Sequence, residues 1–317
     1  MTVESHVELD AQYRQLREEC GVLERGDRGR LLISGPDAAE YLQGQLTNDI
    51  EALEPGEGCY AALLDRKGHI QADMRVLRLA SDEIWLDTEP EGTGAALRHL
   101  QMYKIGREVE VADESSSRSI TSLVGPRSAE IAGSPPLPEF AAETIGVAGT
   151  ECTAVGTHEG IDLIAPATDA ARLRDALLGA GAAPVDLEAA EILRVEAGVP
   201  RFGSELSTET MPAEAGIVER AVSFTKGCYI GQEPVARLHY KGRPNRHLRG
   251  LSLSAPSNNG AALRLGEKEV GRIGTACVSP AHGPIALAVV RREAEPGAEL
   301  AVGEDEVTAR VVDLPFG

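Results

Sequence analysis

The chain has 317 residues, of which 42% are hydrophobic and 3% aromatic, and its formal net charge at pH 7 is -19. This length can bury a substantial core and suggests two or three domains. The acidic balance disfavours nucleic acid and anionic membranes as general partners. No apolar run of about 18 residues could form a membrane-spanning helix, and the acidic N-terminus lacks the pattern of a signal peptide. We therefore expect a cytoplasmic globular protein.

The cysteines exclude some classes of metal site. Five cysteines lie far apart in the sequence, without a CxxC pair or a cluster with histidine at metal-binding spacing. A protein-ligated iron-sulfur cluster requires about four ligands. We therefore predict neither a zinc site nor a resident cluster, and the odd number of cysteines agrees with a reducing compartment.

The N-terminal half alternates helices with short strands. Apolar residues at helical spacing predict a helix over residues 8–20, ended by Gly21. A buried strand over 30–34 then leads through Gly35-Pro36 into a helix. Further on, alternating and apolar runs predict strands over 59–65, 70–77, 84–87 and 107–111, a tight turn over 66–69 and a helix over 93–103.

Residues 120–131 repeat the pattern of an apolar strand, Gly-Pro and an Ala-Glu pair that begins at residue 30. The repeat suggests two related α+β units, although a chance match of so short a pattern is the alternative. A strand is expected over 161–165, and helices over 169–178 and 186–197. Beyond Arg249, short apolar runs separated by Gly, Pro and Asn favour a small β-barrel or sandwich.

One segment is the strongest candidate for chemistry. Residues 226–237 (KGCYIGQEPVAR) place the thiol of Cys228 between two glycines, just ahead of an expected helix. The positive end of that helix, with Lys226 and Arg237, favours the thiolate form. The alternative is that the backbone needs a small, half-buried residue here. Residues 226–249 also carry six Lys/Arg against the single acid Glu233, which indicates either a solvated edge or a site for a compact anionic ligand.

Two carboxylates are further candidates. Glu196 falls in the last turn of the predicted 186–197 helix, where the helix dipole disfavours an anion. Arg194 or Arg201 could compensate its charge, or the carboxylate could bind two N–H donors of a ligand. Asp73 lies on the polar face of the predicted 70–77 strand, where simple solvent exposure is the alternative to a functional role.

These motifs resemble the folate-binding YgfZ family, a branch of the aminomethyltransferase (glycine cleavage T-protein) superfamily. Residues 226–233 with Arg237 match that family's K-G-C-[FY]-x-G-Q-E-x-x-x-R motif. Residues 41–49 (YLQGQLTND), 65–69 (DRKGH) and 194–200 (RVEAGVP), followed by GSEL and MPAE, are similar to further family motifs in the same order. The resemblance covers nearly the whole chain.

The resemblance implies an α+β, T-protein-like arrangement of three parts. Two α+β subdomains would surround a central folate cleft over residues 1–244, and a small C-terminal β-barrel would occupy residues 245–317. Glu196 would grip the pterin of tetrahydrofolate, including its polyglutamylated forms. The cofactor-binding residues that the motifs imply, besides Glu196, are Asn48, Asp73, Lys226, Tyr229, Gln232 and Arg237.

Two functions follow from this resemblance. The first is a tetrahydrofolate-binding protein that supports the assembly or repair of iron-sulfur enzymes through Cys228, with iron-sulfur client or assembly proteins as partners. Residues 68–73 (GHIQAD) depart from the G-G-x-x-D-D pattern of aminomethyltransferases at His69 and Ala72, which favours this function. The alternative is an enzyme, a folate-dependent aminomethyl or methyl transferase in which Asp73 positions the reacting amine. A third hypothesis is that folate binding is lost and only an interaction surface remains.

Overall fold

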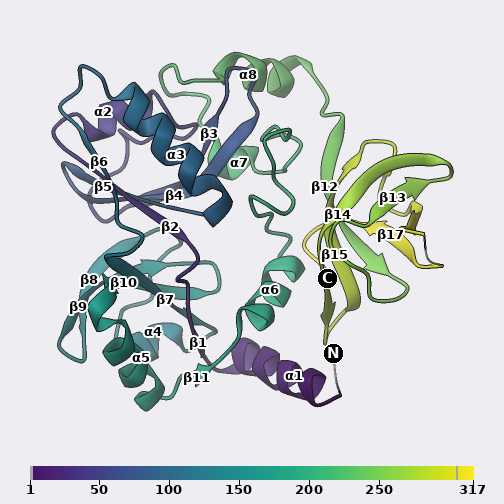
Figure 1. The fold of residues 1–317 in the computed structure, drawn as a ribbon, viewed down its shortest axis with the longest axis horizontal. Helices are drawn as coiled ribbons and strands as arrows, with labels where there is room; N and C mark the ends of the chain where they lie inside the picture. Colours follow the sequence, from purple (N-terminus) through teal and green to yellow (C-terminus); the bar gives the residue numbers. More distant parts are fainter. Residues whose placement is uncertain (1–2, 305) are drawn as a thin grey trace. The chain divides into compact units, whose positions relative to one another are not determined.

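The protein is described by a computed structural model that covers residues 3–304 and 306–317, with side chains of the first helix described from Glu8. The chain forms two compact units, each assembled from separated segments (Figure 1). Unit 1 comprises Met1–Leu63, Ala72–Ala190 and Thr225–Ile230, and unit 2 comprises Leu64–Gln71, Glu191–Phe224 and Gly231–Gly317.

Unit 1 contains a five-stranded sheet of order β3-β4-β5-β2-β6. Its strands are β2 (Gly29–Ser34), β3 (Gly58–Leu64), β4 (Ile70–Ala80), β5 (Glu83–Thr88) and β6 (Glu110–Asp113). The helices α2 (Ala38–Gln43) and α3 (Pro90–Tyr103) accompany this sheet, and α3 packs on β2 and β6. Leu31, Ile33, Met74 and Leu100 belong to the core that these elements enclose.

A six-stranded sheet of order β11-β1-β7-β10-β9-β8 forms the rest of unit 1. Its strands are β1 (Gly21–Glu24), β7 (Arg118–Val124), β8 (Ala142–Val147), β9 (Thr150–Gly156), β10 (Gly160–Pro166) and β11 (Ala183–Pro184). Three α-helices, α1 (Val3–Glu18), α4 (Ser128–Ala132) and α5 (Ala170–Gly179), and the short helix η1 (Ala167–Asp169) complete this part. Leu123, Leu163 and Leu173 lie in its core.

The two Gly-Pro units have the same local structure. Gly35 follows β2 with φ 124° and Gly125 follows β7 with φ 125°, and each precedes a short helix. A Cβ atom on Gly35 would lie 2.2 Å from the carbonyl oxygen of Glu108, and one on Gly125 would lie 2.5 Å from that of Glu19. Only glycine combines this φ with so close an approach of backbone, so the repeated pattern reflects a repeated strand-turn-helix geometry.

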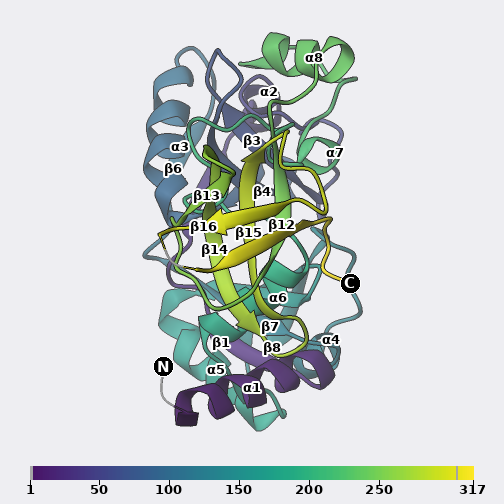
Figure 2. The same ribbon diagram turned by 90° about the vertical axis from the view of Figure 1, so that its right-hand side faces the viewer.

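Unit 2 contains a closed barrel of order β12-β15-β14-β13-β16-β17, whose strands are drawn in green to yellow in Figure 2. Its strands are β12 (Arg246–Leu253), β13 (Ala262–Leu265), β14 (Lys268–Ser279), β15 (Gly283–Arg291), β16 (Glu299–Val302) and β17 (Thr308–Val312). The helices α7 (Val218–Ala221) and α8 (Gln232–Lys241) precede it. The helix α6 (Leu187–Glu196) begins in the last residues of unit 1 and ends in unit 2.

The α+β fold with a C-terminal β-barrel agrees with the prediction from the sequence. The predicted helices over 93–103, 169–178 and 186–197 correspond to α3, α5 and α6. The hairpin strands β8 and β9 were missed, because their polar residues mask the alternation on which a strand prediction depends. The predicted boundary at 244/245 stays a proposal: the barrel begins at Arg246, but unit 2 also takes in earlier segments. Within the described part of the chain, no helix is long and apolar enough to cross a membrane.

Candidate functional site

Asp73 lies in β4 and is only 6% exposed, so the simple solvent exposure considered from the sequence does not apply. The hydroxyl of Tyr60 donates a hydrogen bond to Asp73 Oδ2 at 2.5 Å. Asp73 Oδ1 is buried and has no hydrogen-bond partner among the described residues. A buried carboxylate oxygen without a donor is costly, and such an atom marks a place where a ligand N–H or O–H can bind.

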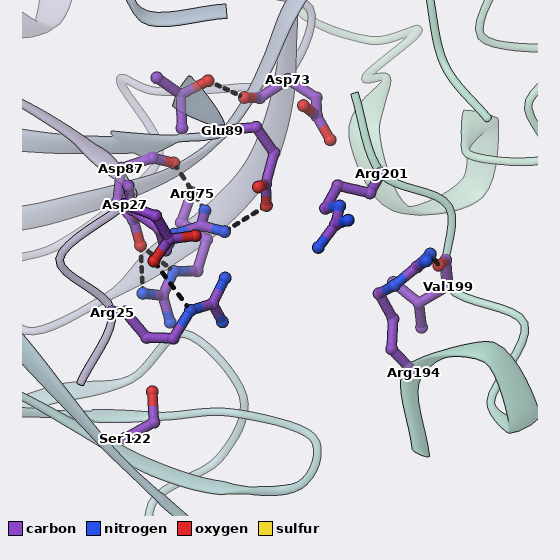
Figure 3. Close-up of polar contacts among 12 residues, drawn as sticks. Arg25, Asp27, Asp73, Arg75, Asp87, Glu89, Ser122, Arg194, Val199 and Arg201 are labelled. Atoms are coloured by element: carbon purple, nitrogen blue, oxygen red, sulfur yellow. Dashed lines mark hydrogen bonds and ion pairs between the residues drawn. The ribbon is translucent and has the colours of Figure 1, made fainter. Parts of the chain in front are cut away.

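A cluster of buried charges in the same unit surrounds Asp87 of β5. Arg28 pairs with Asp87 and with Glu89, and Arg75 pairs with Asp87 and with Asp162 of β10. Figure 3 shows Arg75 beside Asp87, with dashed lines that mark the contacts of this carboxylate. Burial alone would raise the pKa of Asp87, but the two arginines hold it below its usual value. The cluster therefore pairs each arginine with two carboxylates.

The environment of Asp73 differs from that of Asp87. Burial raises the pKa of Asp73 to about 6, the hydrogen bond from Tyr60 opposes this rise, and the charge of Glu89 adds to it. A carboxyl group with a pKa near the physiological range can exchange a proton with a bound amine. Asp73 is thus suited to accept an N–H donor or a proton, whereas Asp87 holds the structure around it.

Lys226 supports a loop of unit 1. Its Nζ atom donates to the carbonyl oxygens of Gln43, Leu46 and Asn48 at 2.6–2.7 Å. Burial lowers the pKa of this amine to about 8. A lysine ammonium has three N–H donors, and all three are used here. We therefore propose a structural role for Lys226 in place of the direct folate contact predicted from the sequence.

Asn48 lies in the loop that Lys226 holds. Its side-chain amide donates to the carbonyl of Tyr60 at 2.8 Å, and its oxygen accepts from the backbone N–H of Asp49 at 2.9 Å. Through these bonds the motif at residues 41–49 supports the strand that presents Tyr60 to Asp73. A positioning role for Asn48 follows from this geometry, while its predicted contact with folate stays a proposal.

The residues that follow Lys226 differ in exposure. Tyr229 is 7% exposed, its ring centroid lies 5.2 Å from Lys226 Nζ, and its hydroxyl has no hydrogen-bond partner among the described residues. Burial raises the pKa of this phenol to about 12, so it is neutral and able to donate. Cys228 is exposed, whereas Cys20 and Cys152 are buried. An exposed thiol does not serve as a small core residue, which weakens the structural alternative for Cys228.

In unit 2, Glu196 ends α6 and is 6% exposed. Its Oε1 atom accepts a hydrogen bond from the hydroxyl of Ser279, in β14, at 2.5 Å. Of the two arginines considered as its partners, Arg194 pairs with Glu191 and Glu205, and Arg201 pairs with Glu191. Arg194 also donates to the carbonyl of Val199 (Figure 3). Ser279 therefore orients a buried carboxylate at a helix end.

The remaining predicted residues lie on α8, also in unit 2. Gln232 is its first residue, and Arg237 is exposed in its middle. Of the described residues, no group of three or more His, Cys, Asp or Glu could hold a metal ion. The predicted site residues thus fall into two sets, Asn48, Asp73, Lys226, Cys228 and Tyr229 in unit 1 and Glu196, Gln232 and Arg237 in unit 2.

Sequence reasoning missed the partners that position the two carboxylates. Tyr60 lies 13 residues before Asp73, and Ser279 lies 83 residues after Glu196. Neither residue belongs to a motif, and a single Tyr or Ser in a strand carries no local signal. Asp87 and Glu89 were missed for the same reason, because their arginine partners, Arg28 and Arg75, lie far from them in the sequence.

The fold is that of the T-proteins, with their C-terminal barrel. Residues 4–226 match the family model of the GCVT N-terminal domain, and residues 246–316 match the glycine cleavage T-protein C-terminal barrel domain. The chain therefore belongs to the aminomethyltransferase (glycine cleavage T-protein) superfamily.

Individual relatives agree with this assignment. The aminomethyltransferase of Streptomyces coelicolor is 30% identical over 326 residues, which cover 95% of this chain and 87% of the relative. That of Rubrobacter xylanophilus is 29% identical, covering 97% of this chain and 86% of the relative. The crystal structure of the glycine cleavage system aminomethyltransferase T from Bartonella henselae matches with a TM-score of 0.88 at 24% identity, covering 98% of this chain and 89% of that one.

Proposed function

We propose that this protein binds tetrahydrofolate and transfers a one-carbon unit to it from an amine donor. The observation that carries the proposal is Asp73, a buried carboxylate with one oxygen held by Tyr60 and the other without a protein partner. The chain also belongs to a superfamily whose relatives are named aminomethyltransferases, which supports the same reaction type. A cytoplasmic location, expected from the sequence, is part of this proposal.

The residues of the chain suit this ligand. Tetrahydrofolate would supply the nitrogen atoms that accept the one-carbon unit. Glu196, oriented by Ser279, can accept N–H donors of a pterin, because a carboxylate offers about four acceptor positions. Asp73 would accept a proton or an N–H bond from the reacting amine, and Tyr60 would keep its second oxygen in place.

Calorimetric titration with tetrahydrofolate tests the binding step. We expect the wild type to bind, and Glu196→Gln to bind more weakly, because an amide both removes the negative charge and replaces an acceptor with a donor. Asp175→Asn serves as a matched control, because Asp175 lies on the exposed surface of α5. Absence of heat with the wild type would remove the folate proposal and leave the interaction-surface hypothesis.

The transfer step needs a separate assay. Protein, tetrahydrofolate and a lipoyl-linked aminomethyl donor should yield methylenetetrahydrofolate and ammonia. Asp73→Asn should lower kcat by about 10²-fold or more, the typical contribution of a positioned acid or base, and leave tetrahydrofolate binding within about threefold. Equal kcat values for the variant and the wild type would exclude Asp73 from the reaction.

A second function rests on Cys228, which is exposed and lies in the motif that resembles the YgfZ branch. In this function the protein binds folate and supports iron-sulfur enzymes through the thiol, with client or assembly proteins as partners. One thiol cannot hold a cluster alone, because a protein-ligated cluster needs about four ligands. The thiol would therefore act with a partner.

Rescue of iron-sulfur enzyme activity, in cells that lack the protein, separates the two functions. Cys228→Ala should abolish the rescue but keep tetrahydrofolate binding, while Cys277→Ala, a half-buried thiol of β14, should keep both. Full rescue by Cys228→Ala would exclude the thiol function. Transfer activity without any rescue by the wild type would favour the one-carbon transferase.

A further inference from the structure

A pocket of about 330 Å³ lies within unit 2, between α8 and the turn that connects β3 to β4. Three cations and three apolar side chains line it, namely Lys67, Arg237, Lys241, Met211, Pro234 and Leu238. On α8 the lining residues recur at helical spacing, so one face of this helix forms a wall. The mixture of positive charge and hydrocarbon indicates the kind of ligand the pocket would take.

The cations of the pocket have no acidic partners. The side chains of Lys67, Arg237 and Lys241 form no ion pair or hydrogen bond with any described residue. Glu233 stands four residues before Arg237, at the favourable helical spacing, yet the two form no ion pair across the described structure. The three cations of the pocket thus carry no compensating carboxylate from the described part of the chain, although the net charge of the chain is -19.

The arrangement is also electrostatically unfavourable without an anion. Arg237 and Lys241 are four residues apart on α8, where like charges repel each other. Gly68 lets the turn approach the helix, because it has φ 84° and a Cβ atom there would lie 3.0 Å from Pro234 and 3.1 Å from Met211. This close packing brings Lys67 to the same pocket, so a bound anion would relieve the repulsion among all three cations.

The rest of the basic stretch is used differently. Arg246 pairs with Glu214, and Arg249 donates to the carbonyl of Leu248. The basic stretch over residues 226–249 is thus divided, and only its part on α8, joined by Lys67, lines the pocket. No motif linked Lys67 to this stretch, because Lys67 lies 170 residues before Arg237.

The geometry favours carboxylates on a chain over a single phosphate. Arg and Lys side chains bind both carboxylates and phosphates, so the spacing of the cations and the apolar wall must distinguish the two. Residues one turn apart on a helix are separated by a rise of about 6 Å, which suits separate carboxylates joined by hydrocarbon. Leu238, Pro234 and Met211 offer apolar contact to such hydrocarbon.

We propose that this pocket binds a short chain of glutamates, with its carboxylates at the three cations and its methylene groups on the apolar wall. Folates carry such a chain as a γ-linked glutamate tail, so this source of the ligand rests on the proposed function. A free oligoglutamate has the same chemistry. The pocket would thereby select polyglutamylated over monoglutamylated tetrahydrofolate.

Titration with tri-γ-glutamate tests the pocket itself, independently of folate. Three exposed contacts of about 0.5 kcal/mol each correspond to about a tenfold change in affinity. The triple variant Lys67→Gln/Arg237→Gln/Lys241→Gln should bind at least about tenfold more weakly than the wild type. The matched control Arg291→Gln/Arg292→Gln/Arg310→Gln removes the same charge from exposed barrel positions and should bind like the wild type. Absence of binding to the wild type, or an equal loss in both triple variants, would overturn the proposal.

A comparison of tetrahydrofolate with one and with three glutamates identifies the source. The wild type and the barrel variant should bind the triglutamate form about tenfold more tightly, and the pocket variant should bind both forms equally. Equal affinities in the wild type would exclude the folate tail as the occupant. If neither form binds, the proposed function fails, while the tri-γ-glutamate titration still decides the pocket.

Discussion

The buried carboxylates Asp73 and Asp87 should influence stability with opposite dependence on pH. The pKa of Asp73 is raised from an ordinary value of 3.8 to about 6, and each pKa unit corresponds to about 1.4 kcal/mol. The ionised form of Asp73 therefore costs about 3 kcal/mol in the folded protein. The stability that neutral Asp73 contributes is fully present below its unfolded pKa and is lost as pH rises through about 6.

Asp73→Asn removes this titration. Between pH 4 and pH 7.5, we expect the free energy of unfolding of the wild type to fall by about 2.5 kcal/mol relative to that of the variant. Urea denaturation followed by fluorescence measures it well, because Trp85 is the only tryptophan, is 2% exposed and lies in β5 of the same sheet. A difference that does not change with pH would refute the account of Asp73.

Asp87→Asn should show the opposite pH dependence of stability. The pKa of Asp87 is depressed, because Arg28 and Arg75 outweigh the effect of burial, so its contribution is present above the unfolded pKa and is lost as pH falls through the folded one. This variant should lose about 3–5 kcal/mol near pH 7.5, since it leaves buried arginine charge uncompensated. The loss should be nearly unchanged at pH 4 and should shrink only as pH falls below the ordinary value of 3.8. The same pH trend in both variants would refute the reasoning for the pair.

Three further predictions concern stability and reactivity. Lys226→Met should lower the free energy of unfolding by about 3 kcal/mol, because three backbone carbonyls lose their donor. The control Lys268→Met, at an exposed ion pair, should lower it by less than about 1 kcal/mol. Similar losses in the two variants would contradict the structural role of Lys226. Gly35→Ala should lower the free energy of unfolding by about 3 kcal/mol, because Gly35 has φ 124° and its Cβ atom would clash with backbone. Gly133→Ala should lower it by only about 1 kcal/mol, because Gly133 has φ 65° and open space around it. Urea denaturation measures both. Iodoacetamide should modify Cys228 before the other thiols of the native protein, since it is exposed, and peptide mass spectrometry showing another cysteine modified first would contradict this order.

Much of the fold could be predicted because its signals are local. The Gly35-Pro36 and Gly125-Pro126 turns mark strand-to-helix transitions that the structure repeats with nearly equal φ. Short apolar runs between Gly and Pro predicted the barrel, because every barrel strand buries one face. Strand β1 was missed, since four residues are too short to establish a period.

The candidate site was predictable only in part. Asp73, Glu196 and Cys228 stand in recognisable motifs, yet their chemical states depend on residues outside them. Tyr60 and Ser279 position the two carboxylates from other strands. No property of a residue's sequence neighbours reports such contacts, because they form only when distant segments pack together.

The segment at residues 226–237 shows which properties local sequence predicts and which depend on the tertiary structure. Its composition and order determined the family resemblance, the helix that follows and a thiol between glycines. Only the tertiary structure decided that Lys226 binds three carbonyls some 180 residues earlier, that Cys228 is exposed, and that Arg237 shares a pocket with Lys67. The physical reason is that local sequence sets backbone preference, whereas burial, charge compensation and donor saturation depend on which distant groups the folded chain brings within a few ångström.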